Sequence, residues 1–172
     1  QAEHLFSNAQ SIENYTNAKK VYQSILSLNM SDSFSKQRVN LCDARIHQIS
    51  MQKLDNELWS ELMRSTPGKA QYQQYLAEFP NGAYAQEARA ALLEIEDNEL
   101  WNTALKLNTR KAFENYLANE NTSLFESEAQ MAIYRIDDEQ AWAETVEMDT
   151  EEAYNRYIED SSNPAKNYQA AA

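Results

Sequence analysis

Acidic residues precede each of the three tryptophans, at positions 59, 101 and 142, and they are groups in this sequence that could do chemistry. Stacked units would align these carboxylates, which repel one another unless salt or a partner screens them. Such a line is a solvated face, a docking strip for a basic or peptide-like protein partner, or a divalent-cation site. The candidate partner-binding residues are Asp55, Glu57, Glu96, Asp97, Glu99, Asp137, Asp138 and Glu139.

Side chains that commonly carry catalysis are sparse. His4 and His47 lack the spacing of metal ligands, and we expect both at the surface. Cys42 is the only cysteine, which indicates a small core side chain rather than a disulfide or a zinc site. Two glycines cannot build a phosphate cradle, and no dinucleotide-binding, nucleotide-binding or zinc-protease motif occurs. We therefore expect no catalytic residue, no metal ligand and no cofactor, and we do not expect an enzyme.

Charge is unevenly distributed along the chain of 172 residues. Residues 1–54 contain six Lys or Arg and four Asp or Glu, whereas residues 55–172 contain nine and twenty-three, so the net charge of −12 comes from the second part. This acidity disfavours nucleic acid and anionic membranes and favours cationic partners, although solubility alone also explains it. No apolar run approaches the ~18 residues of a membrane-spanning helix, and no signal peptide is visible.

The elements that position the acidic residues repeat. The three tryptophans are 42 and 41 residues apart, and residues that favour a helix start follow each of them. Pro67 suits the first helical position, and Asp149 with Glu152 resembles a capping box, in which side chains bond the free N–H groups of the first turn. The three start signals are Thr66-Pro67, Asn108-Thr109 and Asp149-Thr150.

A short helix is predicted after each start signal, because aromatic and aliphatic residues recur at i, i+3 and i+4. Breaks follow at 80–82, 121–123 and 162–164, and long helices are predicted over 83–106 and 124–147. Since the tryptophans have the same register in every unit, we interpret them as packing between units and not as ligand-stacking surfaces. The predicted repeat core is Trp59, Trp101, Trp142, Tyr72, Tyr75, Phe113, Tyr116, Tyr154 and Tyr157.

Each long helix changes its apolar face part-way along. The apolar residues of 84–95 share one face, whereas those of 100–105 share a face rotated by well over about 90°. The copy over 125–146 repeats this change. Because no glycine or proline marks a break near Asp97-Asn98, a continuous helix that contacts two neighbours is favoured over a broken one.

The first unit resembles a known repeat family. ENYTNAKKVYQSILSLNMSD, residues 13–32, resembles the second half of a tetratricopeptide repeat, with Tyr15, Ala18, Tyr22 and Leu26 at its aromatic, small, aromatic and aliphatic positions. The later units, with YQQYL followed by FPNGAYAQEA, are similar to longer variants in bacterial envelope lipoproteins of this superfamily. Their period exceeds the usual 34 residues by about two helical turns.

The resemblance implies an all-α, right-handed superhelical array (α-solenoid) of antiparallel helix pairs. A HEAT-like array is the alternative, because its period is also compatible. The long helices over 83–106 and 124–147 would line the concave groove. The units are expected at about 1–32, 33–80, 81–121 and 122–163, with a partial unit at 164–172.

The function expected from this resemblance is a non-enzymatic protein–protein interaction module. The alternative is a structural spacer or oligomerisation arm of a larger multidomain protein, which the partial last unit favours because a self-contained array needs a polar end cap. The resemblance implies a bacterial cell envelope or periplasm rather than the cytoplasm. The residues themselves leave the compartment, the partner and the oligomeric state open.

Overall fold

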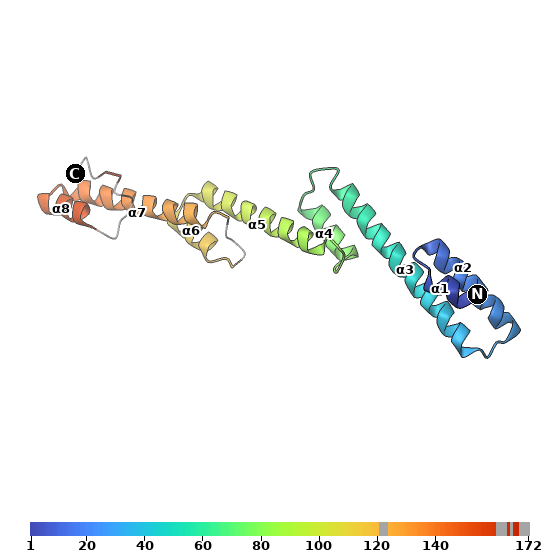
Figure 1. The fold of residues 1–172 in the computed structure, drawn as a ribbon. Helices are drawn as coiled ribbons and strands as arrows, with labels where there is room; N and C mark the ends of the chain where they lie inside the picture. The colour runs from blue at the N-terminus through green and yellow to red at the C-terminus, as the bar shows by residue number, and fades with distance from the viewer. Residues whose placement is uncertain (121–123, 161–164, 166, 169–172) are drawn as a thin grey trace. The chain divides into compact units, whose positions relative to one another are not determined.

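The computed structural model describes residues 1–120, 124–160, 165 and 167–168 (Figure 1). These residues form eight helices and no strand, so the all-α prediction is confirmed. None of these helices is long and apolar enough to cross a membrane. The helices are α1 (Ala2–Ser7), α2 (Ile12–Leu28), α3 (Ser33–Leu62), α4 (Lys69–Glu78), α5 (Ala85–Leu107), α6 (Arg110–Leu117), α7 (Glu126–Met148) and α8 (Glu151–Glu159).

The chain divides into two compact units, residues 1–89 and residues 90–172, and the division falls within α5. The first unit is built on α2 and α3, with α1 packed against α2. Ser11 and Asp32 cap α2 and α3 by accepting backbone N–H groups of the first turn. Cys42 is buried, which confirms it as a core residue, and burial raises the pKa of its thiol.

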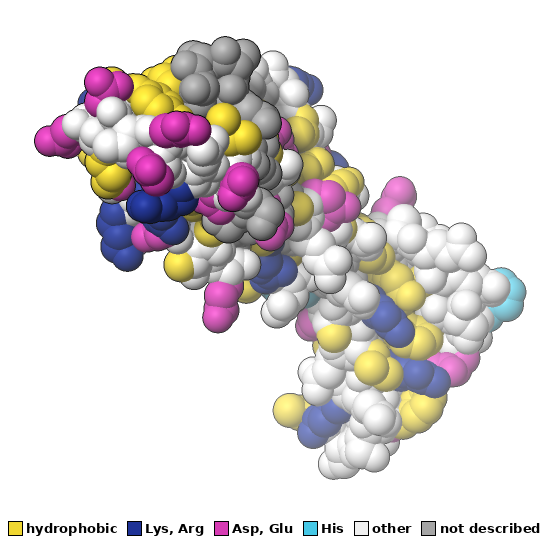
Figure 2. All heavy atoms as spheres, turned by 90° about the vertical axis from the view of Figure 1, so that its left-hand side faces the viewer, with side chains coloured by type: hydrophobic (Ala, Val, Ile, Leu, Met, Phe, Trp, Pro, Cys, Tyr) yellow, Lys and Arg dark blue, Asp and Glu magenta, His cyan; other side chains and the backbone are white. Residues whose placement is uncertain are grey.

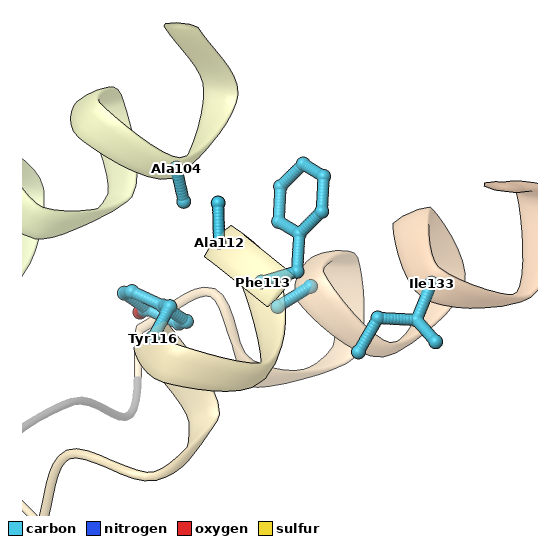
Figure 3. Close-up of a cluster of buried hydrophobic side chains, with 6 residues drawn as sticks. Ala104, Ala112, Phe113, Tyr116 and Ile133 are labelled. Carbon is cyan, nitrogen blue, oxygen red and sulfur yellow. The ribbon is translucent and has the colours of Figure 1, made fainter. Parts of the chain in front are cut away.

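The second unit has a hydrophobic core formed by residues of α5, α6 and α7 (Figure 3). Phe113 and Tyr116 of α6 are almost fully enclosed, and Phe113 lies between Ala104 of α5 and Ile133 of α7. Further along, α7 packs against α8. The aromatic stripe predicted for the short helix is thus turned into the core.

Threonines begin the short helices of the second unit, as predicted. Thr109 and Thr150 have extended backbone, and each hydroxyl accepts the backbone N–H three residues later at 3.2 Å. The residues before them, Asn108 and Asp149, adopt the left-handed conformation with φ of 45°. Asparagine and aspartate tolerate this conformation, which ends each long helix.

Two details of the predicted helix starts are wrong. Asp149 forms no capping box with Glu152, because it is the left-handed residue at the end of α7 and Thr150 caps α8 instead. Pro67 is not the first helical residue, since Gly68 is the N-cap of α4. The predicted break at 80–82 does separate α4 from α5. The breaks at 121–123 and 162–164, and most of the partial unit at 164–172, lie outside the described residues.

Both long helices of the repeat are continuous, as the absence of glycine and proline indicated. In α7, Ala129 and Ile133 belong to the core shared with α6. Asp138 and Thr145 lie about 180° around the helix, on the side of α8. The change of apolar face therefore reflects one helix that packs against two different partners.

Candidate functional site

A buried aspartate lies in each copy of the repeat, four residues before the tryptophan. Asp55, Asp97 and Asp138 expose 5%, 2% and 0% of their surface. One carboxylate oxygen of each accepts a short, charge-assisted hydrogen bond from a tyrosine hydroxyl on the following short helix. The O···O distances are 2.5 Å from Tyr75 to Asp55, 2.5 Å from Tyr116 to Asp97 and 2.6 Å from Tyr157 to Asp138.

The same pair of side chains holds the backbone that follows the short helix. The other carboxylate oxygen accepts an N–H group at 2.7, 2.9 and 2.8 Å, from Ala83, Leu124 and Asn167 respectively. The phenol oxygen accepts the next N–H group at 3.3, 3.1 and 3.2 Å, from Tyr84, Phe125 and Tyr168 respectively. We call each set of one aspartate, one tyrosine and two N–H groups a clasp, and we name it by its aspartate.

A tryptophan stack covers each clasp. The indole lies parallel to the ring of the residue whose N–H group bonds the clasp phenol. It also contacts the clasp tyrosine, with 5.1–5.4 Å between ring centroids. The stacked pairs are Trp59–Tyr84 at 5.0 Å, Trp101–Phe125 at 5.0 Å and Trp142–Tyr168 at 5.3 Å. Each tryptophan therefore packs between its own long helix, the short helix and the segment that follows.

Burial, and next the hydrogen bond to the carboxylate, raises the pKa of Tyr75, Tyr116 and Tyr157 from 10.0 to about 12. The phenols are therefore protonated at neutral pH and donate to the aspartates. These acids and phenols bond one another and the backbone, so their chemical role is to join helices.

A variant clasp lies at the N-terminus. The Tyr22 hydroxyl donates to the carboxylate of Glu3, and the two residues are 19 apart, as in the Asp97 clasp. Arg38 donates to Glu3 at 2.8 Å and lies over the ring of Phe34. Burial and the bond to Glu3 raise the pKa of Tyr22 to about 12. This copy is hard to find in the sequence because glutamate replaces aspartate and no tryptophan follows, but the spacing of 19 residues was an available signal.

Burial of Asp55, Asp97 and Asp138 corrects their assignment to a partner-binding strip. Each of these positions faces the short helix, where the carboxylate accepts bonds from the tyrosine and the backbone. A basic segment at the surface cannot reach these oxygens.

The other five candidates lie outside the core, and they do not form one line. Counted from the buried aspartate, Glu96 and Asp137 come one residue before it, Glu139 one residue after it, and Glu57 and Glu99 two residues after it. Because successive residues are rotated by about 100°, these side chains spread around the helix.

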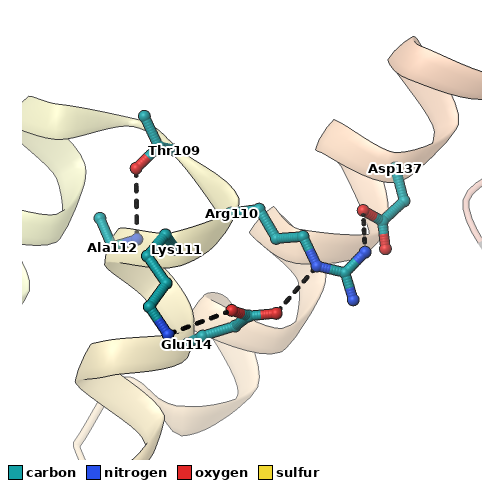
Figure 4. A network of polar contacts seen from close by, with 6 residues as sticks. All are labelled: Thr109, Arg110, Lys111, Ala112, Glu114 and Asp137. Carbon is teal, nitrogen blue, oxygen red and sulfur yellow. Dashed lines mark hydrogen bonds and ion pairs between the residues drawn. The ribbon is translucent and has the colours of Figure 1, made fainter.

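Several of these surface acids have basic neighbours within the chain. Asp137 bonds Arg110 at 2.6 Å, and Arg110 also bonds Glu114 at 2.9 Å (Figure 4). Glu139 lies 3.3 Å from Arg135. Such exposed pairs contribute about 0–1 kcal/mol each to the stability of the fold, so their main effect is to neutralise part of the surface charge.

The histidines are exposed, as expected from their spacing in the sequence. His4 is on α1 and His47 is on α3. Across the described part of the chain, no group of three or more His, Cys, Asp or Glu side chains is placed to hold a metal ion.

An open groove lies between the long and the short helix in two copies of the repeat. The α7–α8 groove has a volume of about 450 Å³, and the α3–α4 groove has a volume of about 280 Å³. The first is lined by Ala141, Glu144, Thr145, Met148, Ala153, Arg156, Tyr157, Glu159 and Asp160. The second is lined by Leu58, Glu61, Leu62, Ser65, Gln71, Gln74 and Tyr75.

The two grooves occupy the same place in the repeat. In both copies the groove is lined by long-helix residues three, six and seven positions after the buried aspartate, and by the residue ten positions after it, which is Met148 in α7 and Ser65 just beyond the end of α3. The clasp tyrosine, Tyr75 or Tyr157, forms part of each wall. In the Asp97 copy, the residues three and ten positions after the aspartate are Leu100 and Leu107, which are 39% and 61% exposed. The repeat thus presents one kind of surface whose lining differs between copies.

Comparisons with family models, with curated proteins and with solved structures find no match to this chain.

Proposed function

We propose that the chain is a non-enzymatic protein-interaction module, a TPR-like right-handed array of antiparallel helix pairs that binds a basic or peptide-like protein segment. The observation that carries this proposal is the groove that recurs at the same repeat positions with a different lining. Repeat proteins present such surfaces on a common frame and vary the side chains that line them.

The clasps support binding over catalysis. A catalytic acid or base must be able to reach a substrate, whereas each clasp carboxylate accepts a tyrosine hydroxyl and a backbone N–H group inside the protein. The chemically capable groups of the repeat therefore maintain the frame, and recognition is left to the grooves and the acidic surface.

Affinity capture from the source cell tests the interaction function. The native chain is compared with a variant in which Glu57, Glu96, Glu99, Asp137 and Glu139 are changed to Gln or Asn. We expect the native chain to retain specific proteins that are released as salt shortens the screening length from about 10 Å at 0.1 M to 3 Å at 1 M. Equal retention by both forms would place the contact away from these five residues. Retention of nothing beyond the bare matrix would overturn the interaction function.

A structural spacer or oligomerisation arm of a larger protein is the second candidate. It is favoured by the sharing of α7 between two clasps, since Phe125 at its start stacks on Trp101 while Asp138 in its second half holds Tyr157. Small-angle scattering of a stacked array should give a radius of gyration clearly above the ~16 Å of a compact sphere of this length. A radius of gyration above ~16 Å without captured partners would favour the spacer. A radius of gyration at or below ~16 Å would contradict the stacked array.

A further inference from the structure

Charge distinguishes the two grooves, although they occupy the same place in the repeat. Residues 1–89 contain nine Lys or Arg and nine Asp or Glu, whereas residues 90–172 contain six and eighteen. The whole net charge of −12 therefore lies on the unit that carries the α7–α8 groove. The α3–α4 groove lies on a unit without net charge, and its polar lining includes the neutral Gln71 and Gln74.

The α7–α8 groove combines an apolar surface with an acidic rim. Ala141 and Met148 contribute alkyl surface, and Met148 is 54% exposed. Glu144, Glu159 and Asp160 also line the groove, together with one basic side chain, Arg156. Figure 2 views the molecule from the side of α8, where acidic side chains lie beside exposed hydrophobic atoms. An unbranched methionine adapts its shape to an apolar partner side chain.

We infer that the α7–α8 groove binds a two-turn amphipathic helical segment of another protein, with apolar side chains in the groove and Lys or Arg beside Glu144 and Glu159. This inference names the site and the partner chemistry of the proposed interaction function, and it rests on that function. Such a segment complements the groove in charge and matches it in length.

The length of the groove matches such a segment. From Ala141 to Met148 the groove follows α7 over seven residue steps, which is about 10 Å along the helix. Apolar side chains at i, i+3 or i+4 and i+7 of a docked helix span the same distance. Basic residues beside this stripe meet a lining with more acidic than basic side chains, Glu144, Glu159 and Asp160 against Arg156, which speeds association and disfavours acidic partners. A second copy of the chain would bring a further −12 to the surface and is disfavoured.

The methionines provide a direct test with the full chain. Methyl labelling gives five methionine signals; Met148 lines the groove, whereas Met131, on the same helix, does not. The probe is a synthetic helical peptide with Leu at i, i+4 and i+7 flanked by Lys. Two comparison peptides carry Glu in place of Lys, or Ser in place of Leu. We expect the Lys–Leu peptide to shift the Met148 signal and to bind at least about tenfold more tightly than both others.

Two substitutions on α7 form a matched pair. Glu144→Lys and Glu147→Lys change the net charge equally at exposed positions, but only Glu144 lines the groove. We expect Glu144→Lys to weaken peptide binding about tenfold and Glu147→Lys to change it by about twofold or less. Native helical circular dichroism shows that each variant is folded, and an unchanged Met131 signal shows that the effect is confined to the groove. Equal weakening by both substitutions would mean attraction to the general charge and would overturn the assigned site.

The remaining outcomes separate this site from the proposed function. If the peptide binds but the Met148 signal does not shift, the groove is not the binding site. A Met148 shift that follows chain concentration without peptide also overturns it, because a second copy is then the occupant. If affinity capture retains partners but the Lys–Leu peptide does not bind, the assignment of the groove is wrong. The proposed interaction function is then still supported. If neither occurs, both are wrong.

Discussion

The hydroxyl oxygen of Tyr116 lies 2.5 Å from a carboxylate oxygen of Asp97, and both side chains are buried. The phenol donates a hydrogen bond to the carboxylate. The two side chains also accept the backbone N–H groups of Leu124 and Phe125, which holds this segment in place. Because a buried carboxylate that loses a donor stays desolvated, the pair is costly to break from either side. The frame of this repeat therefore depends on polar bonds as well as on apolar packing.

Removal of the Tyr116 hydroxyl should destabilise the second unit. Tyr116→Phe keeps the ring but removes the hydroxyl that donates to Asp97, and it leaves the Phe125 N–H without the acceptor it has in the native chain. We expect the free energy of unfolding to fall by about 1.5–3 kcal/mol, measured by urea denaturation with circular dichroism. Tyr134→Phe, at a half-buried position of α7, is the control and should stay within about 0.5 kcal/mol of the native value. Equal small effects from both substitutions would mean that the clasp contributes no stability.

High pH should unfold the protein through the clasp tyrosines. Their pKa is about 12 in the folded chain against an ordinary 10.0, so the folded state holds the phenol protons more tightly. This stability is fully present below pH 10.0 and is lost as the pH rises toward about 12, by about 1.4 kcal/mol per pH unit for each tyrosine. Denaturation across this range should show the decline, and Tyr116→Phe should decline less steeply. An identical slope in the variant would contradict the assignment.

The repeat itself could be predicted from the sequence because its signals are local. The i, i+3, i+4 stripe led by Phe113 and Tyr116 and the threonine caps Thr109 and Thr150 act within a few residues, and the tryptophans mark how often this local pattern recurs. Each one sets a helix start or a buried face without reference to the rest of the chain. The structure places these features as expected.

The buried aspartates could not be assigned from local pattern, because a carboxylate in a polar stretch indicates a solvated face. Their burial depends on a phenol about twenty residues later. One comparison within the chain does distinguish them. Aspartate recurs four residues before every tryptophan, whereas the residue immediately before this aspartate varies among Leu54, Glu96 and Asp137. The grooves were also missed, since they arise only when the long and short helices are packed together.

A side chain at Gly82 should disturb the Asp55 clasp. A Cβ there would lie 2.8 Å from Asp55 Oδ2, from the Tyr75 hydroxyl oxygen and from Phe79 Cβ. We expect Gly82→Ala to cost about 1–3 kcal/mol of stability, since these enclosed groups have little room to move. Asn81→Ala, at the exposed neighbouring position, should stay within about 0.5 kcal/mol. Hydrogen exchange of the Ala83 amide should speed up only in Gly82→Ala, and an unchanged rate would count against the close contact.

Trp101 should act through packing and not through ligand contact. Its ring centroid lies 5.0 Å from Phe125 and 5.4 Å from Tyr116, so Trp101→Ala removes the cover of the Asp97 clasp. We expect a loss of roughly 3–5 kcal/mol in urea denaturation, and a smaller loss for Trp101→Phe, which keeps a ring against Phe125. Leu105→Ala, at a 47% exposed position of α5, should change stability by about 0.5 kcal/mol or less.

Binding measurements separate the two possible roles of this indole. If Trp101 only packs, a partner or probe peptide should bind the folded fraction of Trp101→Phe with native affinity, because the α7–α8 groove does not include this residue. A stability loss under about 1 kcal/mol for Trp101→Ala, together with a large drop in partner affinity, would instead make it a contact residue. Since Trp59 and Trp142 stack in the same way, the same pair of measurements on each would show whether the role belongs to the repeat or to one copy.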